Sequence, residues 1–418
     1  MILPGTSCPS TTTSCRSMAN GRRASKATPA RLLALKLTRE VRNRDAYLRE
    51  LVSSARETTR LPPEEFDFAQ VLAFGAVMCR GTLDEAIDRS LSSPRDVKPK
   101  VRDALRISAY ELLFLHKAEH VVVDQGVELV RCVTPRAAGF ANAVLHKMAR
   151  DARDFPWGDV STDDAAWARS FGMPLWLAER LAAQYGRDVA TTVMEADLRP
   201  APRYLRDNPF DPDNPFACDL SAQRVADLVP LDGTMLEIGA GRGTKTMLLE
   251  SRAFETLGHT VPIHTVDLHE YRARLHAERM QQAGIEDVLS LTGDARDLDG
   301  IDGVLPLYDA VLLDAPCSGT GTMRRHPEIR WNLTPDDVSD LAELQRALLD
   351  EAACHVAVGG TLVYATCSIL DEENQQVVDT FLAAQPQDAW RIDEGSFATL
   401  PALDGPDGHF AAVLQRVK

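Results

Sequence analysis

The sequence predicts an all-α N-terminal domain followed by an α/β domain built around a parallel sheet. Apolar residues recur at helical spacing from about residue 29 to residue 150, whereas from about residue 219 short apolar runs alternate with amphipathic stretches. A proline-rich segment, residues 208–215, lies between the two patterns. The chain has 418 residues, which is enough for two or three domains.

Composition and charge are typical of a globular protein and exclude a membrane-spanning one. Hydrophobic residues make up 44% and charged residues 26% of the chain, as in ordinary globular proteins, and no apolar run is long enough to cross a membrane. The net charge is −15, but residues 1–60 hold twelve Lys and Arg against four acidic residues, so a polyanion is expected to contact this part first. The eight cysteines show no CxxC spacing, which predicts no disulfide framework, no metal site and a reducing cytoplasmic location.

Residues 1–28 are rich in Ser, Thr and Arg and contain no acidic residue. They lack the continuous apolar segment of a secretory signal, and an organelle transit peptide is disfavoured because the segment has no clear amphipathic period. We expect a disordered leader, with Met18 as an alternative start of translation.

The helical domain is predicted over residues 29–150. Apolar residues such as Leu105, Ile107 and Leu112 follow a helical period, and prolines at 62–63, 94 and 135 mark the breaks between helices. Residues 151–218 are predicted to form a helical connector and a linker, with helices over 175–185 and 189–196.

The α/β domain is predicted over residues 219–418. Its candidate strands, with helices between them, are Met235–Ile238, His264–Val266, Val288–Leu291, Ala310–Leu313 and Gly360–Tyr364.

A glycine-rich turn follows the first of these strands. Glycines at 239, 241 and 243 let backbone approach a ligand closely, and the helix that follows offers free N–H groups to an anion. The ExGxGxG spacing resembles the cofactor loop of Rossmann-type methyltransferases more than the GxGxxG of dinucleotide enzymes. The predicted cofactor-binding residues of this turn are Gly239, Ala240, Gly241, Arg242, Gly243, Thr244 and Lys245.

Aspartates end the next two strands of the predicted sheet. Asp267 is placed to accept hydrogen bonds from ribose hydroxyls, and Asp294 follows the third strand, where such enzymes usually contact adenine. Either aspartate alone could equally be a helix N-cap or a solvated turn residue. Because they and the glycine-rich turn follow successive strands, we favour a cofactor site.

Two cysteines follow the fourth and fifth strands. Cys317 lies in Asp314-Ala-Pro-Cys-Ser-Gly-Thr-Gly, and Cys367 lies in Tyr364-Ala-Thr-Cys-Ser, followed by Glu372-Glu373-Asn374. Most cysteines are inert apolar residues, but open α/β sheets bind ligands at the carboxyl ends of their strands, which is where these two are placed. The other six cysteines have no such context.

This pair of motifs resembles the RNA cytosine-C5 methyltransferases, and most closely the branch that acts on small-subunit ribosomal RNA. Residues 30–150, ending in Gly139-Phe-Ala-Asn-Ala-Val-Leu145, resemble the NusB-like helical RNA-binding domain of that branch. Segments 218–223 and 406–410 also resemble the family. The resemblance covers most of the chain, and it implies a Rossmann-type methyltransferase domain that uses S-adenosylmethionine.

The resemblance also implies roles for three residues. A thiolate must add to C6 of cytosine before C5 can take a methyl group, and by similarity Cys367 is that nucleophile. Cys317 assists release of the product, and Asp314 hydrogen-bonds N3 and the exocyclic amine of the base and also lies beside the cofactor. The target base must be unstacked, so the implied partner is single-stranded or flipped small-subunit ribosomal RNA.

A basic and aromatic cluster follows Cys317, and this position predicts that the cluster contacts RNA. It comprises Arg324, Arg325, His326, Arg330 and Trp331. A solvated loop with the tryptophan in the core is the alternative.

Two features depart from the family pattern. The turn reads Glu237 and Gly241-Arg242-Gly243 where the family usually has Asp and Ala-Pro-Gly-Gly-Lys, and only residues 209–218 stand where the family has several dozen RNA-contacting residues. Three other functions therefore stay open: methylation of another RNA such as transfer RNA, a non-catalytic RNA-binding assembly factor, and a small-molecule methyltransferase, which would leave the two cysteines unexplained. We expect a monomer that does not contact membranes.

Overall fold

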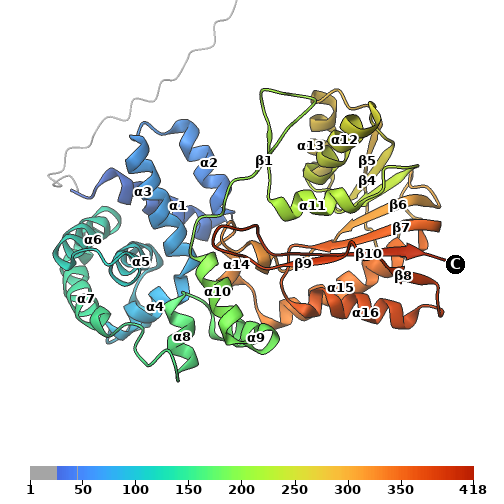
Figure 1. The fold of residues 1–418 in the computed structure, drawn as a ribbon. Helices are drawn as coiled ribbons and strands as arrows, with labels where there is room; N and C mark the ends of the chain where they lie inside the picture. Colours follow the sequence, from blue (N-terminus) through green and yellow to red (C-terminus); the bar gives the residue numbers. More distant parts are fainter. Residues whose placement is uncertain (1–25, 45) are drawn as a thin grey trace, which may run out of the picture.

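The computed structural model describes residues 26–44 and 46–418. The predicted disordered leader, residues 1–28, and the alternative start at Met18 lie almost entirely outside the described residues. Within the described part, helices occupy the N-terminal third and a twisted sheet with helices on both faces occupies the C-terminal half (Figure 1).

The N-terminal helices pack around one apolar core. The first is α1 (Pro29–Arg44), and it is followed by α2 (Leu48–Thr58), α3 (Pro63–Met78), α4 (Arg80–Arg89), α5 (Pro99–Leu113), α6 (Glu119–Val133) and α7 (Ala138–Asp151). Leu105, Ile107 and Leu112 are buried in this core, as their helical spacing predicts. Helices α3 and α5 begin at prolines, where the missing N–H has no helical partner to lose.

The middle of the chain joins the two parts of the molecule. Helices α8 (Asp164–Ser170), α9 (Leu175–Tyr185) and α10 (Arg187–Asp197) form an apolar cluster that includes Met323 and Ile369 from the C-terminal part. The proline-rich segment then forms turns between the short antiparallel strands β1 (Leu205–Arg206) and β2 (Phe216–Ala217).

The five predicted strands form the parallel part of the sheet, in the order β5-β4-β3-β6-β7. These strands are β3 (Met235–Ile238), β4 (Ile263–Asp267), β5 (Val288–Thr292), β6 (Tyr308–Asp314) and β7 (Val356–Thr366). The C-terminal strands β8 (Trp390–Ile392), β9 (Phe397–Thr399) and β10 (His409–Arg416) extend it antiparallel, so the complete sheet is mixed, with the five predicted strands as its parallel part. The order reverses between β3 and β6, and ligands bind at the carboxyl ends of strands at such a point.

Helices cover both faces of the sheet. On one face, α11 (Leu220–Leu228) and α12 (Thr244–Leu257) share an apolar core with Met235 of β3, and α13 (Glu270–Gln282) lies beside them. On the other, α15 (Pro335–Cys354) and α16 (Gln375–Ala384) pack against Leu236 and Ile238. Successive side chains of β3 point to opposite faces of the sheet and therefore belong to two different apolar cores.

The carboxyl ends of the parallel strands face the N-terminal helices. Strand β10 runs antiparallel to β7 and ends at the far right of the molecule, so β7 ends at the side where α1, α2 and α3 lie (Figure 1). This places the loops after β6 and β7 between the two parts of the molecule.

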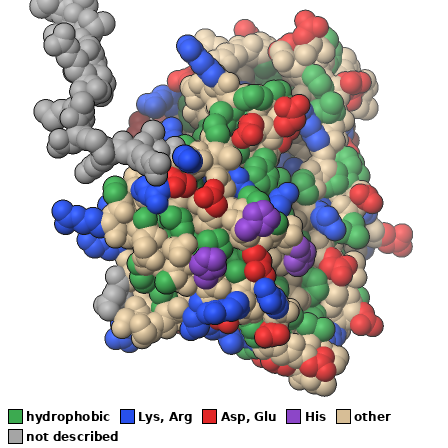
Figure 2. All heavy atoms as spheres, turned by 90° about the vertical axis from the view of Figure 1, so that its left-hand side faces the viewer, with side chains coloured by type: hydrophobic (Ala, Val, Ile, Leu, Met, Phe, Trp, Pro, Cys, Tyr) green, Lys and Arg blue, Asp and Glu red, His purple; other side chains and the backbone are tan. Residues whose placement is uncertain are grey.

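Surface charge on the N-terminal helices is mixed. Figure 2 shows Lys and Arg side chains interspersed with Asp and Glu on this face, rather than one continuous basic area. Among the described residues, no helix is long and apolar enough to cross a membrane.

Candidate active site

A cavity of about 900 Å³ lies where the carboxyl edge of the sheet meets the N-terminal helices. Cys317, Cys367, Asp314 and Lys245 line it from the sheet side, and Tyr47 and Arg49 line it from the N-terminal side. The structure thus brings together the two predicted cysteines and the aspartate that the sequence separates by up to 53 residues, since Asp314 and Cys367 differ by that number.

The two cysteines face each other at the floor of this cavity. Their sulfur atoms are 3.4 Å apart, and the N–H of Gly321 donates a hydrogen bond of 2.9 Å to the carbonyl of Cys367, which joins the two loops. The hydrogen bond from the Cys317 thiol lowers the pKa of Cys367, and the Lys245 ammonium acts in the same direction. The same bond and burial raise the pKa of Cys317 well above its ordinary value, so Cys367 is the cysteine of the pair that loses its proton more readily.

Asp314, the last residue of β6, is paired with Lys245 from the first turn of α12. The Lys245 Nζ to Asp314 Oδ2 distance is 2.5 Å. Burial lowers the pKa of Lys245, but the charge of Asp314 and its hydrogen bond outweigh this effect and leave the pKa raised. Lys245 is therefore a fixed positive charge beside the Cys367 sulfur.

Glu373 joins the two cysteine-containing loops through hydrogen bonds to both. It is fully buried, and its Oε1 accepts hydrogen bonds from the backbone N–H of Ser318 at 2.7 Å and from Gln345 at 3.0 Å. Its Oε2 accepts from the hydroxyls of Ser318 and Ser368, each at 2.5 Å. Ser318 follows Cys317 and Ser368 follows Cys367, so one carboxyl group fixes the residues next to both cysteines.

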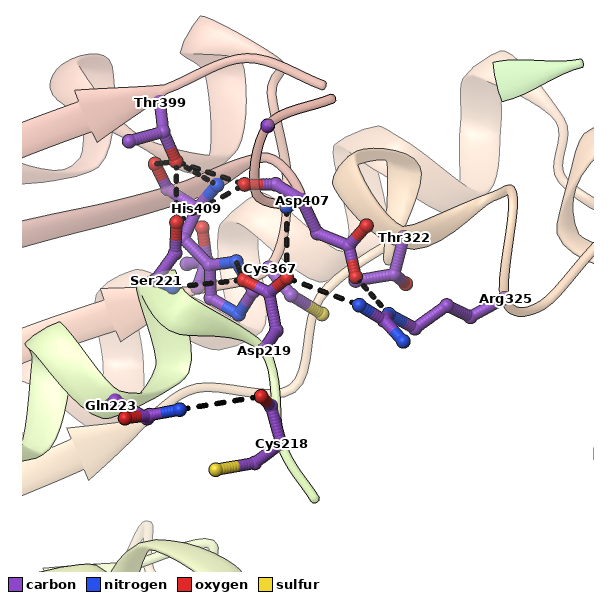
Figure 3. Close-up of polar contacts among 12 residues, drawn as sticks. Cys218, Asp219, Ser221, Gln223, Thr322, Arg325, Cys367, Thr399, Asp407 and His409 are labelled. Atoms are coloured by element: carbon purple, nitrogen blue, oxygen red, sulfur yellow. Dashed lines mark hydrogen bonds and ion pairs between the residues drawn. The ribbon is translucent and has the colours of Figure 1, made fainter. Parts of the chain in front are cut away.

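A second network holds the rim of the cavity, and Figure 3 shows it around Cys367. Asp219 caps α11 by accepting from the N–H of Ser221 at 2.8 Å, and its other oxygen accepts from Arg325 at 3.2 Å and from the N–H of Asp407 at 3.0 Å. Asp407 also pairs with Arg325 (Figure 3). Residues from three distant segments therefore close one side of the cavity.

His409 belongs to the same wall of the cavity. Its side chain is buried, and burial lowers its pKa, so the imidazole is neutral near pH 7. Sequence reasoning did not name Asp219, Asp407 or His409 as site residues, although the resemblance had marked both segments that contain them.

The glycine-rich turn borders a separate cavity of about 390 Å³, which Gly239, Asp267, Asp294 and Asp314 line. Gly239 has a φ of 82°, and a Cβ there would lie 2.3 Å from the Asp314 carbonyl oxygen, so only glycine fits. Asp267 accepts from the N–H of Gly241 at 3.1 Å and from that of His269 at 2.9 Å, which shapes the turn.

The remaining predicted cofactor residues are arranged in different ways. Asp294 lies at the rim, and hydrogen bonds from Arg296 lower its pKa to about 2. Thr244 and Lys245 instead line the cavity of about 900 Å³ that contains the two cysteines, which is called the catalytic cavity below. The Arg242 side chain is exposed and pairs with Glu50 of α2 at 2.9 Å, so it contacts the N-terminal helices rather than the cavity.

The interpretation of the cluster after Cys317 as an RNA contact is wrong for three of its five residues. Arg324 is buried, and its guanidinium bonds Asp407 and the carbonyls of Ala402 and Gly405. Arg330 is fully buried and donates to the carbonyl of Phe171, while Trp331 donates to the carbonyl of Met78 in α3. Trp331 therefore packs against the N-terminal helices, Arg324 and Arg330 are held inside the protein, and only Arg325 and His326 of the cluster line the cavity that contains the two cysteines.

Comparisons with known proteins identify the family of this chain. A family model described as 16S rRNA methyltransferase RsmB/F matches residues 227–414, and the NusB family model matches residues 28–150. The ribosomal RNA small subunit methyltransferase B of Thermus thermophilus is 31% identical over 422 residues, which cover 93% of this chain and 98% of that protein. The chain belongs to the RsmB/F methyltransferase family.

A second relative and a solved structure show the same similarity in sequence and in fold, respectively. The ribosomal RNA small subunit methyltransferase B of Salmonella arizonae is 29% identical, with 82% of this chain and 89% of that protein covered. The crystal structure of PH0851 has a TM-score of 0.73 at 21% identity and covers 94% of this chain and 100% of that one, which shows a shared fold. The predicted fold class, a helical NusB region followed by a Rossmann-type methyltransferase region, is confirmed. Within the described residues, we find no group of three or more His, Cys, Asp or Glu arranged to hold a metal.

Proposed function

We propose that the protein methylates C5 of a cytosine in small-subunit ribosomal RNA, with S-adenosylmethionine as methyl donor and a covalent adduct between Cys367 and C6. The observation that carries this proposal is the cysteine pair, with sulfur atoms 3.4 Å apart in a cavity of about 900 Å³. A pair in which one thiol stabilises the other as a thiolate suits a reaction that must both form and release a thioether.

The cavity beside the glycine-rich turn fits the cofactor. Its volume of about 390 Å³ lies in the range of small-molecule sites, Asp267 retains acceptor capacity for ribose hydroxyls, and Leu344 and Leu348 offer an apolar wall to adenine. Asp314 lines both this cavity and the catalytic one, so the two communicate at that residue. The cofactor supplies an electrophilic methyl group.

Cys367 acts as the nucleophile in this proposal. Its thiolate adds to C6 of the cytosine, the new bond between sulfur and carbon forms, and the C5–C6 π electrons move so that C5 becomes nucleophilic. As negative charge develops on the ring during attack, N3 takes a proton from solvent, and the Asp314 carboxylate accepts hydrogen bonds from that N3–H and from the exocyclic amine, which fixes the orientation of the base and stabilises its N3-protonated form. Lys245 keeps Asp314 in place and favours the Cys367 thiolate.

Cys317 acts at the end of the reaction. After methylation, a water molecule in the cavity takes the proton from C5, the electrons of that C–H bond re-form the C5–C6 double bond, and the C6–S bond breaks so that Cys367 departs as a thiolate; the proton added at N3 returns to solvent. The Cys317 thiol, held within hydrogen-bonding distance of the leaving sulfur, stabilises that thiolate. Without it the covalent protein–RNA adduct should persist.

The test uses unmodified small-subunit ribosomal RNA and methyl-labelled S-adenosylmethionine, followed by digestion and identification of the labelled nucleoside. We expect label in 5-methylcytidine, a loss of on the order of 10³-fold or more in Cys367→Ala, and a slow-migrating adduct on denaturing gels in Cys317→Ala. Cys132→Ala is the matched control, because Cys132 is exposed on α6.

Two outcomes would overturn the proposal. Label in another nucleoside would remove the cytosine assignment. Absence of label, with cofactor binding intact and assembly intermediates also tried, would favour a non-catalytic assembly factor. Normal turnover of Cys317→Ala without an adduct would reassign the role of Cys317.

A further inference from the structure

A smaller cavity of about 270 Å³ adjoins the catalytic one and has no part in the chemistry described above. It lies between α3 and α5 on one side and residues 197–201 on the other, at the junction of the N-terminal helices with the C-terminal part. Arg49 and Arg325 line both cavities, so a chain that enters one can continue into the other past these two side chains.

The walls of this cavity suit a flat aromatic ligand. Phe74, Met78 and Tyr110 contribute apolar and aromatic surface. A Cβ on Gly75 would lie 2.0 Å from the Tyr110 ring, so the glycine lets this ring lie directly against α3. Val71 on the same helix also lines the cavity and is 42% exposed, so this part of the wall is open to a ligand.

A buried acid at the cavity has unused hydrogen-bonding capacity. Asp197, the last residue of α10, is fully buried, and neither carboxylate oxygen has a hydrogen-bond partner among the described residues. Its nearest cation, Arg330, is 3.6 Å away, which balances charge without making a good hydrogen bond. Burial raises the pKa of Asp197 to about 7, with the charges of Arg330 and Arg324 opposing this, so the group can both donate and accept hydrogen bonds near neutrality.

The mouth of the cavity carries basic side chains with no acidic partner. Arg49 and Arg199 are exposed, and neither forms an ion pair with residues in the part of the chain that the structure describes. Exposed guanidinium groups without an ion pair are suited to bind the phosphates of a nucleic acid.

We infer that this cavity binds a nucleotide of the substrate RNA that flanks the target cytosine. The base lies against Phe74 and Tyr110 with its polar edge toward Asp197, and the phosphates lie near Arg49 and Arg199. A base that presents both a donor and an acceptor matches Asp197. This inference rests on the proposed function, and it adds a second site of base recognition at which sequence context around the cytosine is read.

The test is a double-mutant cycle between protein and RNA. The probe is an RNA fragment centred on the cytosine that the labelling experiment identifies, together with versions in which each of the nearest neighbours is abasic. We expect one abasic position to raise KM for wild type about tenfold, the size expected for loss of one base–aromatic stack, with little change in kcat. In Phe74→Ala, KM should already be raised, and the same abasic position should have no further effect.

Matched variants separate this effect from general loss of fold or charge. Phe74→Leu keeps an apolar side chain of similar bulk and serves if Phe74→Ala does not fold. Arg199→Ala should weaken RNA binding, whereas Arg136→Ala, which removes an exposed arginine on the N-terminal helices, should not. Additive effects of Phe74→Ala and every abasic position would overturn the inference, because the side chain and the base would then not be in contact.

The inference can fail separately from the proposed reaction. If wild type produced no 5-methylcytidine, filter binding of unmodified small-subunit ribosomal RNA would replace KM as the readout. Weaker binding by Phe74→Leu and Arg199→Ala than by Arg136→Ala would keep the RNA contact and discard the chemistry. Equal binding by all three variants would discard the contact as well.

Discussion

Glu373 is the residue on which the geometry of both cysteines depends. It accepts four hydrogen bonds while fully buried, three of them from Ser318 and Ser368, the residues that directly follow Cys317 and Cys367. A glutamine has the same shape, but its amide nitrogen cannot accept a hydrogen bond, so half of the contacts would be lost or reversed.

We therefore expect Glu373→Gln to lower kcat about 10- to 100-fold without changing the affinity for the methyl donor, and to shift the pH profile of the reaction because the cysteine pair changes geometry. Steady-state kinetics and donor titration measure both quantities. Glu372→Gln is the matched control, since Glu372 is its neighbour and pairs with Arg180 near the surface. Equal effects of the two substitutions would contradict this role.

The cysteine pair predicts a pH dependence that a thiol reagent can measure. The hydrogen bond from Cys317 is the largest influence that lowers the pKa of Cys367. Cys317→Ala removes it, so the Cys367 pKa should rise, and the thiolate should appear only at higher pH.

Iodoacetamide alkylation of Cys367, followed by mass spectrometry across pH, should therefore show its midpoint at higher pH in Cys317→Ala than in wild type. Cys354→Ala, an exposed cysteine at the end of α15, should leave the midpoint unchanged. A midpoint that fell or stayed constant in Cys317→Ala would show that the hydrogen bond does not favour the thiolate.

At the scale of elements, the turn between β3 and α12 has to pass very close to the end of β6. Gly239 has a positive φ of 82°, and a Cβ added at this residue would lie only 2.3 Å from the carbonyl oxygen of Asp314. Gly258, which ends α12, has a nearly identical φ of 81° but open space around it. Substitution at Gly258 therefore tests the cost of backbone strain alone, whereas substitution at Gly239 adds a steric clash with β6.

Gly258→Ala should cost only the strain of a left-handed residue, about 1 kcal/mol, and leave donor binding unchanged. Gly239→Ala should cost more, roughly 3 kcal/mol, and abolish donor binding because β3 and β6 must separate at the cofactor cavity. Denaturant unfolding and donor titration test this. Similar losses of stability and of donor binding in both variants would show that backbone strain alone accounts for the effect of Gly239→Ala.

At the scale of the whole molecule, a short helix from the C-terminal part docks into the N-terminal helices. Helix α14 (Ile329–Asn332) carries Trp331, whose indole donates to the carbonyl of Met78 at 2.8 Å. A Cβ on Gly81 of α4 would lie 2.0 Å from its ring, and Arg80 donates to the Trp331 carbonyl at 2.6 Å. The catalytic cavity takes walls from both parts, so this contact also sets its shape.

Trp331→Ala should lower the free energy of unfolding by about 2–4 kcal/mol, which is somewhat less than the loss expected for a fully buried tryptophan. The N-terminal and C-terminal parts of the molecule should then unfold in two separate transitions. Calorimetry detects the split. Donor binding should persist, while KM for RNA should rise because Tyr47 and Arg49 lose their position. Trp390→Ala, at the far edge of the sheet in β8, is the control for loss of a tryptophan, and a single shared transition in Trp331→Ala would contradict the docking role.

The sequence by itself determined the order of most elements and the chemical types of the residues that meet at the candidate site. Periodicity and proline positions predicted the N-terminal helices, and short apolar runs predicted the five parallel strands. The motifs around Gly239, Asp314, Cys317 and Cys367 marked the edge of the sheet where these residues meet. The strands β8 and β9 were missed because they have only three residues each, too few to show a period.

Only the tertiary structure decided which charged residues are free to contact a ligand. Arg324 and Arg330 read as surface cations in the sequence, yet both are buried against acids from distant segments, Asp407 and Asp197. Asp219, Asp407 and His409 likewise became part of the site only through the packing of α11 and β10 against the loop after β6. The physical reason is that local sequence fixes hydrogen-bonding periodicity and chemical type, whereas burial and charge pairing depend on segments that meet only when the chain has folded.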